Sequence, residues 1–251
     1  MCDLRIDRQE PSDKLKGDDV LSGRRQRLES PAAAAPGEEE IAAGQAVYSP
    51  SLLKKYDLLV HGFSNHLLWR CPTRHLLALY DENLSDTHLD VGVGTGYFLH
   101  RARFWMADPD ITLLDLNPSC LAYAAKRICR YVPKTVVADV FKPLPDLGPF
   151  KSISLTYLLH CLPGLLIDKA IVLDRLADLA APGAVLFGAT LLQGDVPRNW
   201  GARRLMAFYN AKGIFSNEGD CLADLKEILN SRFKDVRVTL RGCVGLFVAW
   251  V

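Results

Sequence analysis

Short apolar runs alternate with stretches of helical periodicity from Thr87 to the end of the chain. Five runs of strand length come first: HLDVGV (88–93), ITLLDL (111–116), TVVADV (135–140), SISLTYLL (152–159) and AVLFGATLL (184–192). Helical patterns separate them over 96–105, from 117 onward and over 166–179, and Pro182-Gly183 is expected to turn the chain into the fifth run. Strands separated by helices form a parallel sheet covered on both faces, so the pattern predicts a doubly wound α/β fold.

The last two apolar runs break this alternation. VRVTL (236–240) and VGLFVAWV (244–251) are separated by too few residues for a helix. Two strands joined this closely must be antiparallel, so we expect a hairpin that turns near Arg241-Gly242. The predicted sheet is therefore mostly parallel and ends in an antiparallel C-terminal strand.

The N-terminal third has a different character. Residues 1–45 carry many charges, prolines and alanines without a sustained hydrophobic period, which is typical of a disordered tail. Residues 46–85 contain two helical patterns, over 51–61 and 65–80, and Pro72 is expected to break or kink the second. Residues 86–251 then form the main domain, with a long connection over about 193–233.

Composition places the 251-residue chain among soluble globular proteins, since 49% of its residues are hydrophobic and 24% are charged. The net charge of +1 argues against a nucleic-acid partner, and no apolar run is long enough to span a membrane. The N-terminus lacks the apolar core of a secretory signal. Seven scattered cysteines without a C-x-x-C pair argue against a disulfide framework or a metal site. We therefore expect a cytoplasmic protein.

The segment Asp90-Val-Gly-Val-Gly-Thr-Gly96 lies between the first predicted strand and a helix. Gly92, Gly94 and Gly96 would let the backbone turn sharply and let a ligand approach without interference from Cβ atoms. The helix that follows would offer free N–H groups. By itself, such a glycine-rich turn is a weak signal of a ligand site.

Two acidic residues strengthen this signal. Asp115 ends the second strand, about 20 residues further on, where a carboxylate can bind both hydroxyls of a ribose. Asp139 ends the third strand, at the mouth of the crevice of an open sheet. A dinucleotide-binding fold would share these features, but its glycines follow G-x-G-x-x-G rather than G-x-G-x-G, and the terminal hairpin does not belong to its plan.

Four motifs resemble, in order, those of the class I S-adenosylmethionine (SAM)-dependent methyltransferases: LDVGVGTGYFL (89–99), ITLLDLNPSCL (111–121), VVADVFKPL (136–144) and SISLTYLLHCLPG (152–164). The resemblance runs from Tyr48 to the C-terminus and implies a seven-stranded sheet with a reversed last strand, SAM as cofactor, and a helical lid over 46–85. It implies methyl transfer to O, N or C of a small organic molecule, such as a secondary metabolite. Many relatives have an acidic residue in place of Lys151, a position expected to lie away from the methyl group.

Carried over residue by residue, the resemblance implies a cofactor-binding set: Asp90, Gly92, Gly94, Gly96, Asp115, Leu116, Asp139 and Val140. Asp90 would lie near the methionine amino group, with the glycine loop under the cofactor. Asp115 would hold the ribose hydroxyls. Leu116 would pack on the adenine, and Asp139 with Val140 would read the adenine edge.

Two residues are candidates for a catalytic role. His160 follows the strand SISLTYLL, on the edge that would face the sulfonium. A neutral His160 could accept a proton during transfer, or it could hydrogen-bond its own loop. Tyr56, in the predicted lid, would lie near the methyl group by similarity to relatives, with core packing as the alternative. Methyl transfer needs mainly in-line placement, so positioning can contribute more than a base.

The acceptor pocket is expected on the connection 193–233, which is long, aromatic and on the active edge of the sheet. The candidate residues, one of them from the lid, are Trp69, Arg203, Met206, Tyr209, Asn210 and Phe215. Arg203 could meet an anionic acceptor or remain solvated. Neither an aromatic and basic strip nor an N-P-P-Y motif points to nucleic acid, so a small, fairly apolar metabolite fits the sequence better.

Two other functions stay open. A methyltransferase-fold cyclase or pericyclase of natural-product biosynthesis would use SAM as a non-reactive element, or would not use it. A non-catalytic partner subunit would use the fold for assembly, although such proteins usually have degraded cofactor loops. The sequence leaves the methyl acceptor and the oligomeric state open.

Overall fold

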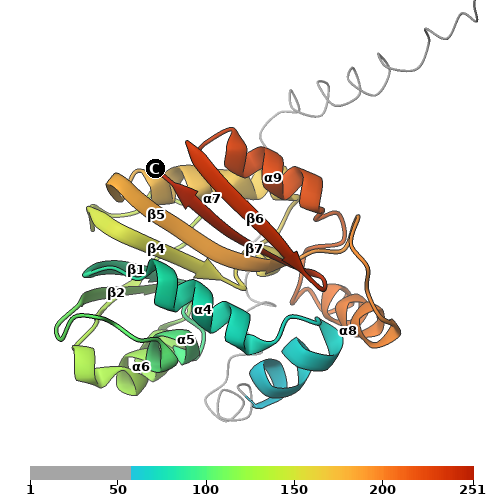
Figure 1. The fold of residues 1–251 in the computed structure, drawn as a ribbon, viewed down its shortest axis with the longest axis horizontal. Coiled ribbons are helices and arrows are strands. Elements are labelled where there is room, and N and C mark those ends of the chain that lie inside the picture. The colour runs from blue at the N-terminus through green and yellow to red at the C-terminus, as the bar shows by residue number, and fades with distance from the viewer. Residues whose placement is uncertain (1–57) are drawn as a thin grey trace, which may run out of the picture. The chain divides into compact units, whose positions relative to one another are not determined.

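The computed structural model describes residues 58–251, and their side chains from Phe63 onward. Its centre is a seven-stranded sheet with the order β3-β2-β1-β4-β5-β7-β6 (Figure 1). The strands are β1 (Thr87–Val91), β2 (Asp110–Asp115), β3 (Lys134–Val137), β4 (Phe150–Thr156), β5 (Ala180–Leu191), β6 (Asp235–Arg241) and β7 (Val244–Trp250). Neighbours from β3 to β5 are parallel, whereas β7 is antiparallel to β5 and β6, which confirms the predicted mixed sheet.

Helices cover both faces of this sheet. They are η1 (Leu58–Leu68, a π-helix), α4 (Thr73–Asn83), α5 (Tyr97–Arg101), α6 (Pro118–Arg127), η2 (Cys129–Tyr131), η3 (Leu159–Cys161), α7 (Leu166–Ala177), α8 (Trp200–Ala211) and α9 (Leu222–Asn230). Helices α4, α5 and α6 lie on one face and α7 and α9 on the other (Figure 1), so the doubly wound prediction is confirmed. Within residues 58–251, no helix is long and apolar enough to cross a membrane.

The C-terminal hairpin is also confirmed. Arg241 pairs with Val244, so Gly242 and Cys243 form a two-residue turn between β6 and β7. The Cys243 N–H donates to the Trp69 carbonyl at 3.1 Å, and this bond fixes the segment between η1 and α4 against the sheet.

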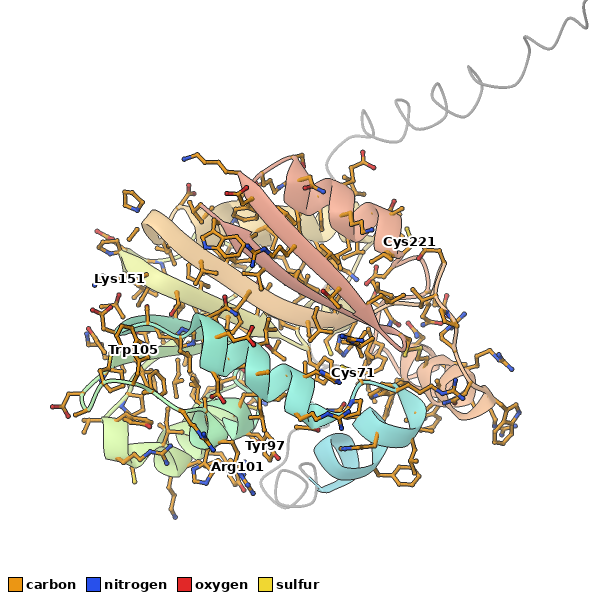
Figure 2. All side chains as sticks on the ribbon, in the orientation of Figure 1. Cys71, Tyr97, Arg101, Trp105, Lys151 and Cys221 are labelled. Carbon is orange, nitrogen blue, oxygen red and sulfur yellow. The ribbon has the colours of Figure 1, made fainter. Side chains whose placement is uncertain are left out.

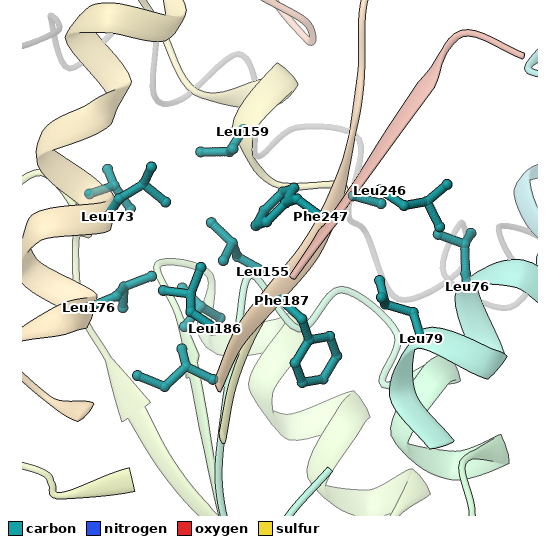
Figure 3. Packing of buried hydrophobic residues seen from close by; sticks show 14 of the residues in the cluster. Leu76, Leu79, Leu155, Leu159, Leu173, Leu176, Leu186, Phe187, Leu246 and Phe247 are labelled. Atoms are coloured by element: carbon teal, nitrogen blue, oxygen red, sulfur yellow. The ribbon is translucent and has the colours of Figure 1, made fainter. Parts of the chain in front are cut away.

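Buried side chains pack on both faces of the central strands (Figure 3). Neighbouring strand residues point to opposite faces, so Leu186 of β5 points toward Leu176 of α7, whereas Phe187 points toward Leu79 of α4. Leu176, Leu186 and Phe187 are completely buried. Each such side chain stabilises the fold by about 1.5–3 kcal/mol through the removal of apolar surface from water.

The pattern over 65–80 does not form one helix. Helix η1 ends at Leu68 and α4 begins at Thr73, with Pro72 in an extended conformation at the N-cap position (ψ 136°). Proline has no N–H to continue a helix, and it disfavours the helical conformation in the residue before it. The predicted break at Pro72 is therefore a complete interruption. Residues 1–57, with the predicted tail, lie outside the described part of the chain.

The observed bounds of α6 agree with the prediction, whereas those of α5 do not. The helix expected from Asn117 begins there, and the Asn117 side chain accepts a hydrogen bond from Ser119 N at 2.9 Å. The helix expected over 96–105 is shorter, because α5 ends at Arg101. Just beyond its end, the N–H of Arg103 donates to Asp81 Oδ1 at 2.8 Å and not to a carbonyl of the helix.

Two strand ends also differ from the pattern. The third strand stops at Val137, so Asp139 lies in the turn that follows. The fifth strand begins at Ala180 and contains Pro182-Gly183 as an irregularity, since the pairing with β4 shifts there. The apolar runs thus locate the strands correctly and misplace only their ends.

Candidate functional site

The glycine-rich turn joins the end of β1 to α5. Gly92 N donates to the Leu114 carbonyl at 2.8 Å, which ties the turn to β2. Gly92 has φ +70°, and a Cβ atom there would lie 2.8 Å from Leu158, so a larger residue would be strained. Gly94 has φ +52°, and the space that its Cβ would occupy is open. The backbone at Gly94 is therefore accessible to a ligand.

A cavity opens beside this turn, at the carboxyl ends of β1 and β4. We call it the glycine-turn cavity; it is lined by Tyr80, Asp90, Gly92, Val93, Gly94, Thr95, Tyr97, Phe98, Thr156 and Tyr157. Open α/β sheets bind ligands in the crevice at the carboxyl ends of their strands. The position of this cavity is therefore the one that the fold favours for a ligand.

Lys151 lies at the other end of the sheet, far from Tyr97 of the glycine-turn cavity (Figure 2). Its Nζ forms an ion pair with Asp86 Oδ2 at 2.7 Å, and both side chains are exposed. The hydrogen bond from Lys151 holds the pKa of Asp86 below its usual value. The departure from relatives at Lys151 is thus remote from the cavity, in agreement with the expectation.

Asp90 is the acidic residue in the lining of the glycine-turn cavity, and it is 5% exposed. Its Oδ1 accepts hydrogen bonds from Tyr80 Oη at 3.1 Å and from Ser154 Oγ at 2.5 Å. Burial raises the pKa of Asp90 to about 6, although both hydroxyls oppose the rise. Tyr80 and Ser154 therefore orient Asp90, and Tyr80 lies outside the four motifs that identify the site.

Asp115 ends β2 next to the same turn. Its Oδ1 accepts a hydrogen bond from Asn117 N at 2.9 Å. Burial raises the pKa of Asp115, while backbone N–H groups, among them that of Gly94, oppose the rise. The charge of Asp115 contributes to the raised pKa of Asp90, so the two carboxyls lie near the same turn.

The three residues predicted to contact an adenine lie on the same edge of the sheet but do not line the glycine-turn cavity. Asp139 Oδ1 accepts a hydrogen bond from Phe141 N at 2.9 Å, so its carboxylate caps its own turn. Val140 is buried, and its carbonyl accepts from Arg175 Nη1 at 3.1 Å. Leu116 is partly exposed directly after β2. Their contact with adenine stays a prediction.

His160 lies in η3 and is 3% exposed. Its Nδ1 accepts a hydrogen bond from Leu191 N at 3.4 Å, and its ring meets Phe215 edge-on at 4.6 Å. Burial lowers the pKa of His160 to about 3, so the imidazole is neutral at physiological pH. These surroundings favour the structural interpretation of His160, and its catalytic role stays a prediction. Tyr56 lies outside the described residues.

A second cavity lies between η1 and α8. This η1–α8 groove has a volume of about 470 Å³ and is lined by Phe63, Ser64, Leu68, Trp200, Gly201, Arg204, Leu205, Phe208 and Tyr209. Asn199 Nδ2 donates to the carbonyls of Leu67 and Leu68 at 2.8 and 3.0 Å, which holds the start of α8 against η1. Most of the lining is apolar, and Arg204 supplies its charge.

Among the predicted pocket residues, Tyr209 alone lines the η1–α8 groove. Trp69 and Met206 are buried in the hydrophobic core. Arg203 Nη1 donates to the Arg198 carbonyl at 2.8 Å, and Asn210 Nδ2 bonds to Asn217 Oδ1 at 3.0 Å. The remaining candidate, Phe215, does not line the groove, and its ring packs against that of Tyr209 with a centroid distance of 4.8 Å.

Tyr157 links the linings of the two cavities through a hydrogen bond. It lines the glycine-turn cavity, and its hydroxyl donates to Asn65 Oδ1 at 2.9 Å, one residue from Ser64 of the groove. Asn65 is fully buried, and its Nδ2 donates to Thr73 Oγ1 at 3.0 Å. Tyr157 has φ +64°, a conformation that non-glycine residues adopt mainly under constraint. A ligand in either cavity would therefore lie close to the Tyr157–Asn65 pair.

The chain is similar in sequence to known methyltransferases. A family model of methyltransferase domains matches residues 89–186. Demethylluteothin O-methyltransferase from Streptomyces thioluteus is 42% identical over 214 residues, which cover 85% of this chain and 93% of that protein. The chain belongs to the class I SAM-dependent methyltransferases.

Two further comparisons agree with this methyltransferase family. The physcion biosynthesis cluster O-methyltransferase from Aspergillus chevalieri is 38% identical over 209 residues, covering 82% of this chain and 94% of that protein. Human N-acetylserotonin methyltransferase, solved in complex with SAM, shares the fold with a TM-score of 0.58 at 17% identity, over 92% of this chain and 65% of that chain. As a member of this family, the chain uses SAM as its methyl donor.

The residues present fit this cofactor. Gly94 leaves open space in the turn, and the carboxyls of Asp90 and Asp115 flank it. The individual roles, with Asp90 at the amino group and Asp115 at the ribose, stay predictions. Among the described residues, no group of three His, Cys, Asp or Glu side chains is placed to hold a metal ion.

Affinity for SAM is expected to fall as the pH is lowered through about 6. At its predicted place beside the cofactor ammonium group, ionised Asp90 would attract that group and protonated Asp90 would not, and burial raises the pKa of Asp90 to about 6. Below this pKa the affinity should fall about tenfold per pH unit. Calorimetric titration between about pH 5 and pH 7 measures the effect. The control is 5′-methylthioadenosine, which lacks the ammonium group; an equal pH dependence for this ligand would contradict the assignment.

Proposed function

We propose that the methyltransferase transfers the methyl group of SAM to a hydroxyl oxygen of a small, mainly apolar secondary metabolite held in the η1–α8 groove. The position of the groove carries this proposal, since Ser64 of its lining is next to Asn65, which is hydrogen-bonded to Tyr157 of the glycine-turn cavity. Oxygen as the accepting atom is supported by the relatives, which are named O-methyltransferases.

The lining of the groove suits a planar, conjugated acceptor. Trp200 and Phe208 are 68% and 53% exposed, so a ligand that covers both rings removes a large apolar area from water. The Arg204 guanidinium lies 5.2 Å from the centre of the Trp200 ring. It could meet a carbonyl or ionised hydroxyl at the rim of the groove while its stem covers apolar surface.

When bound, SAM would supply an electrophilic methyl group: the C–O bond would form as the S–C bond breaks, the electron pair would stay on sulfur, and the hydroxyl proton would pass to water. The chain's part is mainly to align the two reactants. Asn65, held by Thr73, fixes the hydroxyl of Tyr157 where the cavities meet. The His160 ring contacts the rings of both Tyr157 and Phe215, and it therefore helps to hold Tyr157 in place.

Two alternatives are not favoured. The relatives at 42% and 38% identity are named O-methyltransferases, which argues against a cyclase or pericyclase. The glycine turn is open to a ligand at Gly94, which argues against a non-catalytic subunit. A cytoplasmic location and the lack of a nucleic-acid partner stay proposals, supported by scattered cysteines and a net charge of +1.

The direct test is incubation of the purified protein with SAM and a panel of phenolic and enolic metabolites that lack one O-methyl group. Formation of S-adenosylhomocysteine together with a methoxy signal in the product is the expected result. Methylation at carbon or nitrogen alone would overturn the choice of oxygen. Conversion of the acceptor without S-adenosylhomocysteine would favour the cyclase alternative.

Replacing Trp200 by alanine is expected to raise the KM for the acceptor about tenfold, because the variant loses a large aromatic contact worth about 1–2 kcal/mol. The affinity for SAM should not change, since Trp200 does not line the glycine-turn cavity. Trp105→Ala is the matched control, because Trp105 is 80% exposed and lies outside both cavities. Equal KM values for wild type and Trp200→Ala would place the acceptor elsewhere.

A further inference from the structure

Thr156 carries a buried hydroxyl that the described chain does not satisfy. It is the last residue of β4, is 8% exposed, and lines the glycine-turn cavity. Its Oγ1 has no hydrogen-bond partner among the described residues. Tyr80 lies beside it and donates its own proton to Asp90 Oδ1 at 3.1 Å, so Tyr80 is no donor to Thr156. An unsatisfied buried hydroxyl is costly, so a ligand that enters this cavity would gain by bonding to it.

The register of the sheet places this hydroxyl beside Asp90. Asp90 of β1 pairs with Ser154 of β4, and Ser154 donates to Asp90 Oδ1. Residues two apart on a strand point to the same face, so Thr156 lies on the face of Ser154, one step closer to the glycine turn. Because both Tyr80 and Ser154 bind Oδ1, they leave Oδ2 of Asp90 to the ligand.

The order of the strands separates the two ends of the cofactor. Asp115 lies at the end of β2, on one side of β1, whereas Thr156 lies at the end of β4, on the other side. If Asp115 holds the ribose, the amino-acid end of SAM must lie over β1 and β4. That end carries an ammonium donor and a carboxylate acceptor, and a threonine hydroxyl can serve either group.

We propose that Thr156 is a further cofactor-binding residue, whose Oγ1 hydrogen-bonds the amino-acid end of SAM next to Asp90. Tyr80 and Ser154 act as positioning residues, because their hydroxyls fix the Asp90 carboxylate. The inference concerns cofactor binding alone and does not depend on whether the acceptor atom is oxygen.

The test is a comparison of Thr156→Val with Thr156→Ser by calorimetric titration. Valine keeps the shape of threonine and removes the hydroxyl, whereas serine keeps the hydroxyl. Thr156→Val is expected to bind S-adenosylhomocysteine about tenfold more weakly than wild type, and Thr156→Ser to bind it within about twofold. Both variants should bind 5′-methylthioadenosine as wild type does, because this ligand lacks the amino-acid end.

Other outcomes would overturn the proposal. An equal loss of affinity for both ligands would show that Thr156 shapes the cavity rather than bonding to the amino-acid end. Unchanged affinity for S-adenosylhomocysteine with a raised acceptor KM would assign the hydroxyl to the acceptor instead. Thermal unfolding and the 5′-methylthioadenosine titration show whether each variant is folded, so a misfolded protein cannot be mistaken for a loss of this bond.

Discussion

Replacing Lys169 by methionine is expected to lower the free energy of unfolding by about 3–5 kcal/mol, because Asp220 is then buried without its cation. Lys169 of α7 is completely buried, and its Nζ donates to both Asp220 oxygens, at 2.8 and 3.1 Å, and to the Ser216 carbonyl at 2.6 Å. Urea unfolding of both proteins measures the difference. Lys151→Met is the control, since its ion pair with Asp86 is exposed and should contribute little.

Burial works against this pair even in the native protein. It raises the pKa of Asp220 and lowers the pKa of Lys169, so desolvation outweighs the mutual attraction of the two charges. The double variant Lys169→Met/Asp220→Leu should therefore recover most of the lost stability. If the single and double variants were equally unstable, lost packing rather than an unpaired charge would be the cause.

The same ion pair supports the groove. Ser216 N donates to the His160 carbonyl at 2.8 Å, and Phe215 packs between His160 and Tyr209 of the groove. Lys169 thus ties α7 to the segment 193–233, which contains α8. Lys169→Met should consequently raise the acceptor KM under conditions where the variant is still folded.

The fold could be predicted because its signals are local. Apolar runs of strand length give all seven strands, and the cap formed by Asn117 is visible in the order Asn-Pro. The Lys169–Asp220 pair could not be predicted, since 51 positions separate the two residues and nothing in either neighbourhood indicates the other. The bond between Cys243 and Trp69 is likewise a consequence of packing.

In the candidate site, too, some residues belong to local motifs and others are brought in by packing. The glycine turn with Asp90 and Asp115 is a local motif, whereas Tyr80 reaches Asp90 from a different helix. In the groove, the lining residues Trp200, Arg204 and Phe208 share one face of α8, with Met206 on the buried side. The sequence predicted that this helix contributes to the pocket, but not which of its faces lines the groove. That face depends on where η1 packs against α8.

Replacing Asp115 by alanine is expected to weaken the binding of SAM and S-adenosylhomocysteine at least a hundredfold. A carboxylate that binds both ribose hydroxyls makes two charge-assisted hydrogen bonds, each worth about 1.5–3 kcal/mol. Asp115 is positioned for this by its place at the end of β2, beside the glycine turn. The loss should extend to 5′-methylthioadenosine, which keeps the ribose, in contrast to the loss expected at Thr156.

Asp110→Ala is the matched control, since Asp110 lies at the opposite end of the same strand and forms an exposed ion pair with Lys134. Asp115→Asn separates two effects, because asparagine can still accept the hydrogen bond from Asn117 N but carries no charge. Calorimetric titration should therefore rank affinity as wild type, then Asp115→Asn, then Asp115→Ala. Wild-type affinity in Asp115→Ala would exclude the ribose contact, and with it the orientation of the cofactor that places its amino-acid end between Asp90 and Thr156.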